Sequence, residues 1–160
     1  SKTFNLAGLQ TANIFIPDKK IRQKFKENLL ANGLFGLNPF GTTACRAAYD
    51  QGEPWLEDLL RYLNNNLLAL INYFERNIPE IKVIHPQGTY LVWFDCRSLG
   101  LDKHQLRNLF LDQARVFLDE GSLFGPEGDG FQRINIACPR PLLMEALGRI
   151  VAAVKGIPAT

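Results

Sequence analysis

The sequence has no long basic run and no apolar run long enough to cross a membrane. Its 160 residues include 18 Lys or Arg and 16 Asp or Glu, and never more than two basic residues in succession. We therefore expect neither a nucleic acid nor a membrane surface as a partner. A spanning helix needs about 20 consecutive apolar residues. The first residues also lack the charged region and apolar core of a secretory signal.

Cysteine and histidine are scarce as well. The three cysteines, Cys45, Cys96 and Cys138, are odd in number and widely spaced, which does not suggest a disulfide framework. A cytoplasmic protein is the simplest expectation. The two histidines, His85 and His104, have no second ligand at metal-binding spacing, so we expect no metal site.

Two common catalytic and phosphate-binding motifs are missing too. The sequence contains no Gly-x-Ser-x-Gly elbow for a nucleophilic serine. Residues 125–130, GPEGDG, lack the Gly-Lys-Ser/Thr ending of a phosphate loop, and we interpret them as a connector. The carboxylates around this region are expected to serve solubility: Asp112, Asp119, Glu120, Glu127 and Asp129.

The composition that remains is globular, with 46% hydrophobic and 21% charged residues. Residues 9–16 are apolar and predict a short strand. Apolar residues at every fourth position predict an amphipathic helix over residues 17–32. Residues 33–43 predict an apolar loop that packs on a partner or lines a cleft, and residues 43–50 predict a short helix. A leucine stripe predicts the longest helix over residues 53–77.

The pattern changes after residue 77. Strand-like and helical segments then alternate over residues 81–84, 89–94, 102–114, 116–118, 132–137 and 142–155. This β-β-α-β-β-α order can close into a small α/β sandwich. The one strand and helix near the start cannot bury themselves alone, and they indicate the end of another domain.

Two cationic side chains are candidates for chemistry. Lys2 lies between the hydroxyl residues Ser1 and Thr3, although a lysine near a chain end is usually a solvated charge. Arg133 lies in a strand-like segment beside the glycine-rich connector. A guanidinium there can bind a carboxylate through two parallel hydrogen bonds. A solvated surface arginine is the alternative.

Three segments together resemble one known family. Residues 1–8, SKTFNLAG, resemble the cofactor-lysine segment of fold-type-I enzymes that use pyridoxal 5'-phosphate (PLP). Residues 86–93, PQGTYLVW, resemble the small-domain turn and strand of those enzymes. Residues 133–140, RINIACPR, resemble the strand that supplies the arginine for the substrate carboxylate. The resemblance is to the class I/II aminotransferase superfamily, and most closely to its cystathionine β-lyase-like carbon–sulfur lyases.

The resemblance implies roles for matched residues. Lys2 would bond covalently to the PLP aldehyde and then act as general base and acid at the substrate α-carbon. Ser1 would help to position the lysine or the cofactor phosphate. Arg133 would hold the substrate α-carboxylate, and Tyr90 and the loop of residues 36–41 would line the cleft.

The resemblance also implies an α/β fold that is the C-terminal part of a PLP-dependent transferase. Residues 1–50 would be a remnant of the large PLP-binding domain, residues 51–77 a long connecting helix, and residues 78–160 the small α/β domain. Gln10 departs from the pattern, since many relatives have a phosphate-binding arginine there. Family members also have a large region before the lysine, so we expect this chain to be inactive alone.

Three functions remain open at this point. The first is a PLP-dependent carbon–sulfur β-lyase of amino-acid metabolism, which would act on cystathionine or a cysteine conjugate as a homodimer. The second is a class I/II aminotransferase with the same lysine and arginine. The third is a non-catalytic dimerisation or regulatory module.

Overall fold

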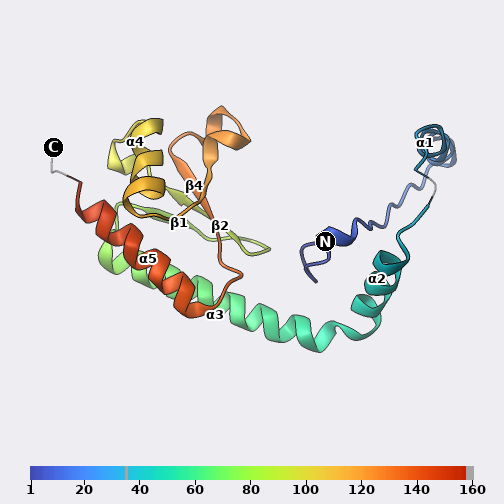
Figure 1. Cartoon of the computed structure of the whole chain (residues 1–160), viewed down its shortest axis with the longest axis horizontal. Coiled ribbons are helices and arrows are strands. Elements are labelled where there is room, and N and C mark those ends of the chain that lie inside the picture. Colours follow the sequence, from blue (N-terminus) through green and yellow to red (C-terminus); the bar gives the residue numbers. More distant parts are fainter. Residues whose placement is uncertain (35, 158–160) are drawn as a thin grey trace. The chain divides into compact units, whose positions relative to one another are not determined.

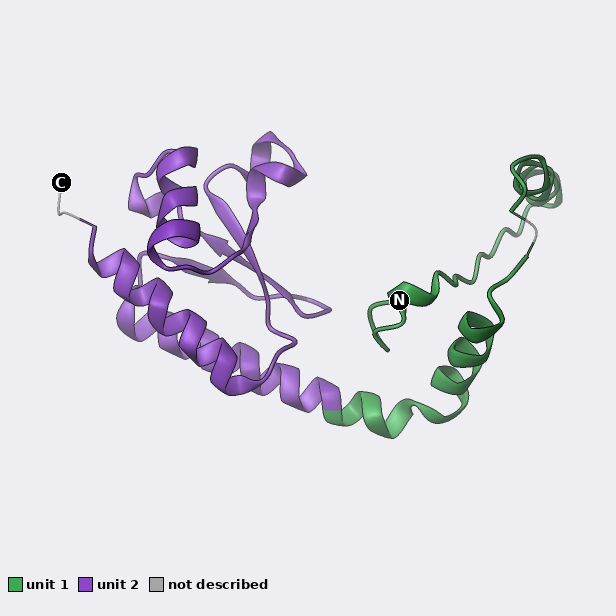
Figure 2. Cartoon of the chain, viewed as in Figure 1, with its two compact units in different colours: residues 1–58 green, residues 59–160 purple. Residues whose placement is uncertain are grey.

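The computed structural model describes residues 1–34 and 36–157, which form two compact units. Figure 2 distinguishes unit 1, Ser1–Asp58, from unit 2, Leu59–Thr160. The boundary falls within the longest helix, α3, Glu53–Asn77. Helices and strands occur together, as the α/β prediction requires.

Unit 1 contains the first predicted helix, at the place where the sequence predicted it. Helix α1, Lys19–Ala31, is preceded by Asp18, whose carboxylate accepts a hydrogen bond from the Ile21 N–H at 2.8 Å. This bond satisfies one of the free amides at the helix start, and Asn32 ends the helix. The amphipathic-helix prediction is confirmed in its bounds.

The second helix is longer than predicted, and the strand predicted at residues 9–16 is absent from the described residues. Helix α2 spans Pro39–Gln51, because Asn38 caps the Phe40 N–H at 3.1 Å and Pro39 suits the first helical position. The expected loop at 33–43, which includes residue 35 outside the described residues, is therefore helical from Pro39 onward. Residues 10–17 have no paired neighbour in the described chain, so the predicted strand at 9–16 is wrong.

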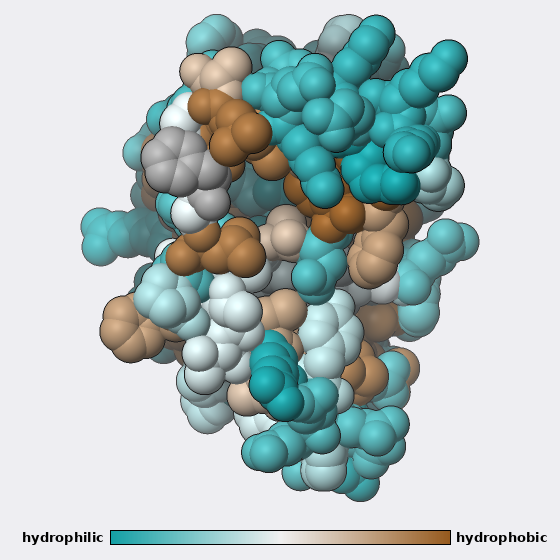
Figure 3. Space-filling model, turned by 90° about the vertical axis from the view of Figure 1, so that its right-hand side faces the viewer, coloured by the Kyte–Doolittle hydropathy of each residue, from teal (hydrophilic) through white to brown (hydrophobic). Residues whose placement is uncertain are grey.

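Unit 1 leaves much apolar surface uncovered. Neither α1 nor α2 buries a side chain; the only buried residue in the two helices is Gly41. Figure 3 shows brown apolar residues interrupting the teal polar surface. The exposed large apolar side chains of this unit include Ile14, Phe15, Ile21, Leu30, Leu34, Leu37, Phe40, Tyr49 and Trp55.

Unit 2 is built on an antiparallel sheet in the order β1-β2-β4-β3 (Figure 1). Its strands are β1 (Lys82–Ile84), β2 (Leu91–Asp95), β3 (Asp119–Glu120) and β4 (Phe131–Asn135). Three of them lie where the sequence predicted strands. The strand predicted at 116–118 instead occupies Asp119–Glu120, because those residues pair with Arg133 and Gln132 of β4.

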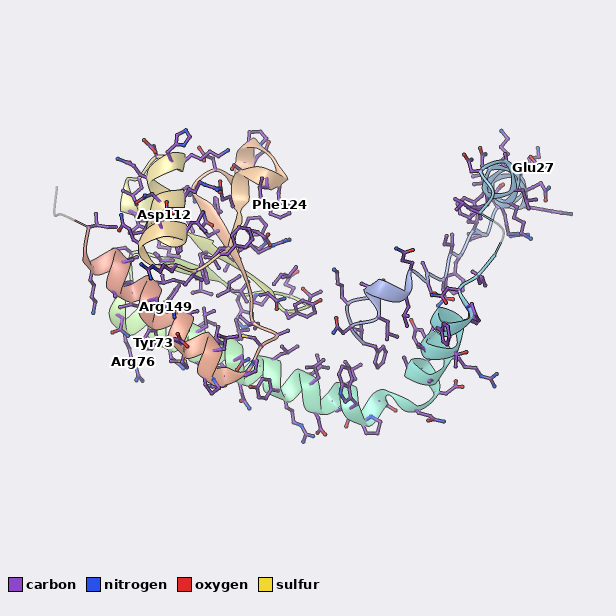
Figure 4. All side chains as sticks on the ribbon, viewed as in Figure 1. Glu27, Tyr73, Arg76, Asp112, Phe124 and Arg149 are labelled. Atoms are coloured by element: carbon purple, nitrogen blue, oxygen red, sulfur yellow. The ribbon has the colours of Figure 1, made fainter. Side chains whose placement is uncertain are left out.

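Helices α3 and α5 (Arg140–Lys155) run beside each other in unit 2 (Figure 4). A Cβ added to Gly148 of α5 would lie 3.7 Å from the Tyr73 hydroxyl of α3. Helix α4, Lys103–Asn108, begins with a reciprocal capping pair between Asp102 and Gln105 and continues into a π-helical turn, Leu109–Gln113. Among the described residues, no helix is long and apolar enough to cross a membrane.

The core of unit 2 lies between one face of the sheet and these helices. Phe94 of β2 meets Phe74 of α3 with ring centroids 5.0 Å apart, and both side chains are fully buried. Cys96 also lies in this core, and burial raises the pKa of its thiol to about 12. Residues alternate along a strand, so Trp93 and Arg133 project from the opposite face. That face carries the candidate chemistry of unit 2.

A buried asparagine ties the segment after β4 to α3. Asn66 is fully buried, and its amide donates to the Ile136 carbonyl at 2.9 Å and to the Cys138 carbonyl at 3.0 Å. Its side-chain oxygen accepts from Nε of Arg140 at 2.7 Å, and the neighbouring Tyr62 hydroxyl accepts from the Arg140 N–H at 2.8 Å. The segment that connects β4 to α5 is therefore fixed by hydrogen bonds and not by apolar packing alone.

Replacing Asn66 should destabilise unit 2 more than replacing its exposed neighbour. Asn66→Leu removes the partner of two carbonyls and one guanidinium, and buried unsatisfied polar groups cost about 1–3 kcal/mol each. We expect a loss of about 2–4 kcal/mol in the free energy of unfolding, measured by urea denaturation. Asn65→Leu, at an exposed position of the same helix, should change it by less than about 0.5 kcal/mol. Equal effects of the two substitutions would contradict this account.

Candidate functional site

Lys2 lies in a tight turn at the start of unit 1. The Leu6 N–H donates to the Ser1 carbonyl at 2.9 Å, and the Asn5 N–H donates to the Lys2 carbonyl at 3.3 Å. Asn5 has a φ of 53°, in the left-handed region that asparagine tolerates better than most residues. The Lys2 side chain is exposed, and no hydrogen bond or ion pair of its amine occurs among the described residues. The Lys2 amine is therefore accessible to solvent.

The Lys2 turn is anchored by an aromatic side chain two residues later. The Phe4 ring stacks on Trp55 at 6.0 Å and meets Tyr49 edge-on at 6.3 Å. Gly52 makes room for it, since a Cβ there would lie 2.6 Å from the Phe4 ring and 2.4 Å from the Ala48 carbonyl. The junction of α2 and α3 thus holds the turn in place.

A second glycine lets the following segment approach α2. A Cβ on Gly41 would lie 2.0 Å from Oγ1 of Thr11. The Asn38 amide donates to the Leu9 carbonyl at 3.2 Å and fixes the same segment. An open pocket of about 980 Å³ lies within unit 1. Ser1 and Thr3, the hydroxyl residues on either side of Lys2, line it, whereas Lys2 itself does not.

Arg133 occupies the middle of a row across the sheet of unit 2. Its Cα pairs with that of Trp93 on β2 and with that of Asp119 on β3. One carboxylate oxygen of Asp119 accepts from both Nε and Nη2 of Arg133, at 3.1 and 2.7 Å. The Arg133 side chain is 22% exposed, so this ion pair is partly shielded from solvent.

Two aromatic rings flank the Arg133 guanidinium. Its Cζ lies 4.2 Å from the ring centroid of Phe124 and 5.9 Å from that of Trp93, both within cation–π range. The two rings meet edge-to-face at 5.3 Å. Figure 4 labels Phe124 on the segment beside the strands of unit 2. Arg133 is therefore not the freely solvated surface arginine of the alternative interpretation.

The same sheet face carries a second arginine in a similar setting. Arg97 donates from Nε and Nη2 to Asp95 at 2.9 and 2.8 Å, and its Cζ lies 4.8 Å from the ring centroid of Phe131. The side-chain hydrogen bond from Arg97 lowers the pKa of the Asp95 carboxyl. Arg97 is 64% exposed, whereas Arg133 is 22% exposed, so solvent screens the Arg97 ion pair more strongly.

Tyr90 lies just before β2 and is half-buried against the core of unit 2. Its carbonyl accepts a hydrogen bond from the Ile136 N–H at 3.0 Å. This contact links the turn before β2 to the end of β4. The substrate-lining role of Tyr90 stays a prediction.

The structure places the predicted site residues in both units. Lys2 and Ser1 lie in unit 1, and Arg133 and Tyr90 lie in unit 2. The sequence pattern did not single out Asp119, which was expected to serve solubility but pairs with Arg133. Its position across a glycine-rich connector from Arg133 was a usable indication, because such segments often pair as hairpins.

The chain matches known proteins over nearly all of its length. The family model for aminotransferase class I and II matches residues 1–150. The cystathionine β-lyase PatB of Bacillus subtilis is 42% identical over 96% of this chain. An aspartate aminotransferase of Pyrococcus horikoshii is 28% identical over 98% of it.

A solved structure supports the same assignment. The structure of cystalysin from Treponema denticola, which contains a pyridoxal 5'-phosphate cofactor, superposes with a TM-score of 0.91 at 36% identity, over 96% of this chain and 39% of that one. The chain likewise spans 40% of the length of PatB and of the aspartate aminotransferase. The α/β fold predicted as part of a PLP-dependent transferase is thereby confirmed, and the chain belongs to the aminotransferase class I and II family.

Proposed function

We propose that the protein of which this chain is a part is a PLP-dependent carbon–sulfur β-lyase. The observation that carries the proposal is the 42% identity to a cystathionine β-lyase, against 28% to an aspartate aminotransferase. The substrate would be cystathionine or another S-substituted cysteine. Because the chain spans 40% of the curated relatives, the activity is proposed for the whole protein and not for these 160 residues alone.

The residues of unit 1 fit PLP as a cofactor. Lys2 offers an exposed primary amine, the group that binds an aldehyde covalently. The hydroxyl residues Ser1 and Thr3 line the adjacent open pocket and could donate to phosphate oxygens. When bound, PLP would supply an electron sink for the charge that develops at the substrate α-carbon.

In the proposed reaction, the Lys2 amine takes the proton from the substrate α-carbon. The Cα–H and Cβ–S bonds break, a Cα=Cβ bond forms, and the sulfur leaves as a thiol after gaining a proton. Water then converts the three-carbon product to pyruvate and ammonia. The protonated amine could then return that proton to the departing sulfur.

Arg133 would hold the substrate α-carboxylate. A guanidinium binds a carboxylate in a planar, two-bonded geometry that fixes orientation as well as position. Tyr90 and the loop of residues 36–41 would line the same cleft, and Ser1 would position the lysine or the phosphate. Residues 1–50 would then belong to the large PLP-binding domain and residues 78–160 to the small one, joined by residues 51–77.

The assembly and location follow from the same proposal. We expect a homodimer in the cytoplasm that acts on small amino-acid substrates. The 160-residue chain alone would be inactive, because its described residues do not supply a full binding site for PLP.

Aminotransfer is the second candidate, favoured by the family model itself. It would use Lys2 and Arg133 in the same positions but return the amino group to a keto acid. A non-catalytic dimerisation or regulatory module is a third candidate, and the exposed apolar side chains of unit 1 are the feature that favours it.

An assay of the protein at its natural length separates these candidates. With cystathionine as substrate, we expect thiol and pyruvate to appear in equal amounts without any added keto acid. Thiol can be measured with a colorimetric thiol reagent and pyruvate with a coupled dehydrogenase. Turnover that requires a keto acid and releases no thiol would establish the aminotransferase instead. Absence of both reactions would favour the non-catalytic module.

Lys2→Ala should abolish covalent retention of the cofactor in the natural-length protein, because no other amine is proposed to bind the aldehyde. Reduction with borohydride followed by peptide mass spectrometry should place the modification on the Lys2 peptide of the unsubstituted protein. The substituted protein should carry none. Modification of another lysine, with Lys2 unmodified, would refute its role. Lys19→Ala, on exposed helix α1, is the control that should leave the modification intact.

Arg133→Leu should lower kcat/KM for cystathionine by about 100-fold or more, because binding would no longer hold the substrate in the orientation that the reaction needs. Arg97→Leu is a matched control, since it removes an arginine with an aspartate partner and an aromatic neighbour on the same sheet face. We expect it to change kcat/KM by less than about threefold. Similar losses in both variants would point to a general structural effect.

A further inference from the structure

Two of the contacts of the Arg133 guanidinium restrain it in different directions. Asp119 binds it in the guanidinium plane, through one oxygen that accepts from Nε and Nη2. The Phe124 ring lies 4.2 Å from its Cζ and restrains it out of that plane. The hydrogen bonds to Asp119 restrict rotation within the guanidinium plane, and the Phe124 ring restricts movement out of that plane. Together they select one orientation of the guanidinium.

The contact with Asp119 also decides which nitrogens remain for a ligand. A guanidinium presents five N–H bonds, and two pairs of them can take a carboxylate side by side. Asp119 occupies the Nε–Nη2 edge. The Nη1–Nη2 edge is the remaining pair that can bind a second carboxylate in two parallel bonds.

The sheet register is what brings Asp119 to this edge. Asp119 and Arg133 are direct partners across the β3–β4 pair, so their side chains leave the sheet on the same face. The Asp119 side chain is 43% exposed. Because both side chains keep some exposure to solvent, Asp119 can hold the arginine without being needed to neutralise a fully buried charge.

We propose that Asp119 is a positioning residue, which holds Arg133 so that its Nη1–Nη2 edge receives the α-carboxylate of the amino-acid substrate. This inference rests on the proposed function, because it takes Arg133 as the group that binds that carboxylate. Asp119 does not touch the substrate. It acts by removing the alternative orientations of Arg133 before the substrate arrives, and such preorganisation raises affinity.

The test measures binding of a simple carboxylate, propionate, to the natural-length protein by calorimetric titration. Asp119→Ala should raise the Kd about tenfold, because Arg133 then samples orientations that cannot bind. Asp95→Ala removes the equivalent partner of Arg97 and should change the Kd by less than about twofold. An unchanged or lower Kd in Asp119→Ala would overturn the proposal.

A second readout separates positioning from a structural role. With cystathionine, Asp119→Ala should raise KM about tenfold and leave kcat within about twofold, and Asp119→Glu should recover most of the loss. A fall in kcat with KM unchanged, or equal effects of Asp95→Ala, would overturn the proposal. If Asp119→Ala does not fold, Asp119→Asn tests the same point, since it keeps an acceptor oxygen but loses the charge. It should weaken propionate binding in the same direction.

Arg133→Leu distinguishes failure of this inference from failure of the proposed function. If Arg133→Leu leaves propionate binding unchanged, Arg133 is not the carboxylate site, and the positioning role fails with it. If Arg133→Leu weakens binding and Asp119→Ala does not, the positioning role alone is wrong. If both weaken binding but the protein does not split cystathionine, the lyase proposal fails and the positioning role stands.

Discussion

The antiparallel register of β2, β4 and β3 is the constraint on which unit 2 depends. With Trp93, Arg133 and Asp119 in one row, Val92 and Ile134 of the same strands face the core. A slip by one residue would reverse every side chain, because successive residues point to opposite faces. Arg133 would then be buried among leucines and phenylalanines without its partner. The same register therefore buries the core side chains and places Arg133 on the opposite face of the sheet.

The hydrogen bonds of Asn66 protect this register at the end of β4. They fix the carbonyls of Ile136 and Cys138 to α3, so the strand cannot slide without leaving buried polar groups unpaired. The Phe94–Phe74 contact holds the other central strand to the same helix. Helix α3 is thus the common support of both central strands of the sheet.

The Lys2 turn is supported by a different mechanism. Unit 1 has little buried core, and two glycines allow close backbone approach where a side chain would collide. The missing side chain of Gly52 leaves space for the Phe4 ring, and that of Gly41 leaves space for the Thr11 side chain. An exposed amine can therefore be held on a defined turn without being buried. This leaves the amine exposed while the backbone of the turn is constrained.

Much of this architecture could be predicted from local patterns. Asp18 marks the start of α1, and the leucine stripe of residues 53–77 marks α3, because capping and helical spacing are properties of neighbouring residues. The family followed from three short segments. The strand at residues 9–16 failed because an apolar segment becomes a strand only when a neighbour pairs with it.

The partners of the candidate site were harder to predict because they depend on register. Asp119 was assigned to solubility, since sequence alone does not show which residue lies opposite Arg133. Asn66 offered an indication that could have been used. It is a polar residue on the buried stripe of α3, where only a hydrogen-bonded side chain is tolerated.

The central claim is that Lys2 and Arg133, carried by separate units, act on the same amino acid. A crystal structure of the natural-length protein with PLP and an unreactive S-substituted cysteine analogue tests it most directly. We predict that the analogue's carboxylate binds the Nη1–Nη2 edge of Arg133, while its α-carbon lies beside the Lys2 amine. A carboxylate bound to another cation, with Arg133 held by Asp119 alone, would contradict the account.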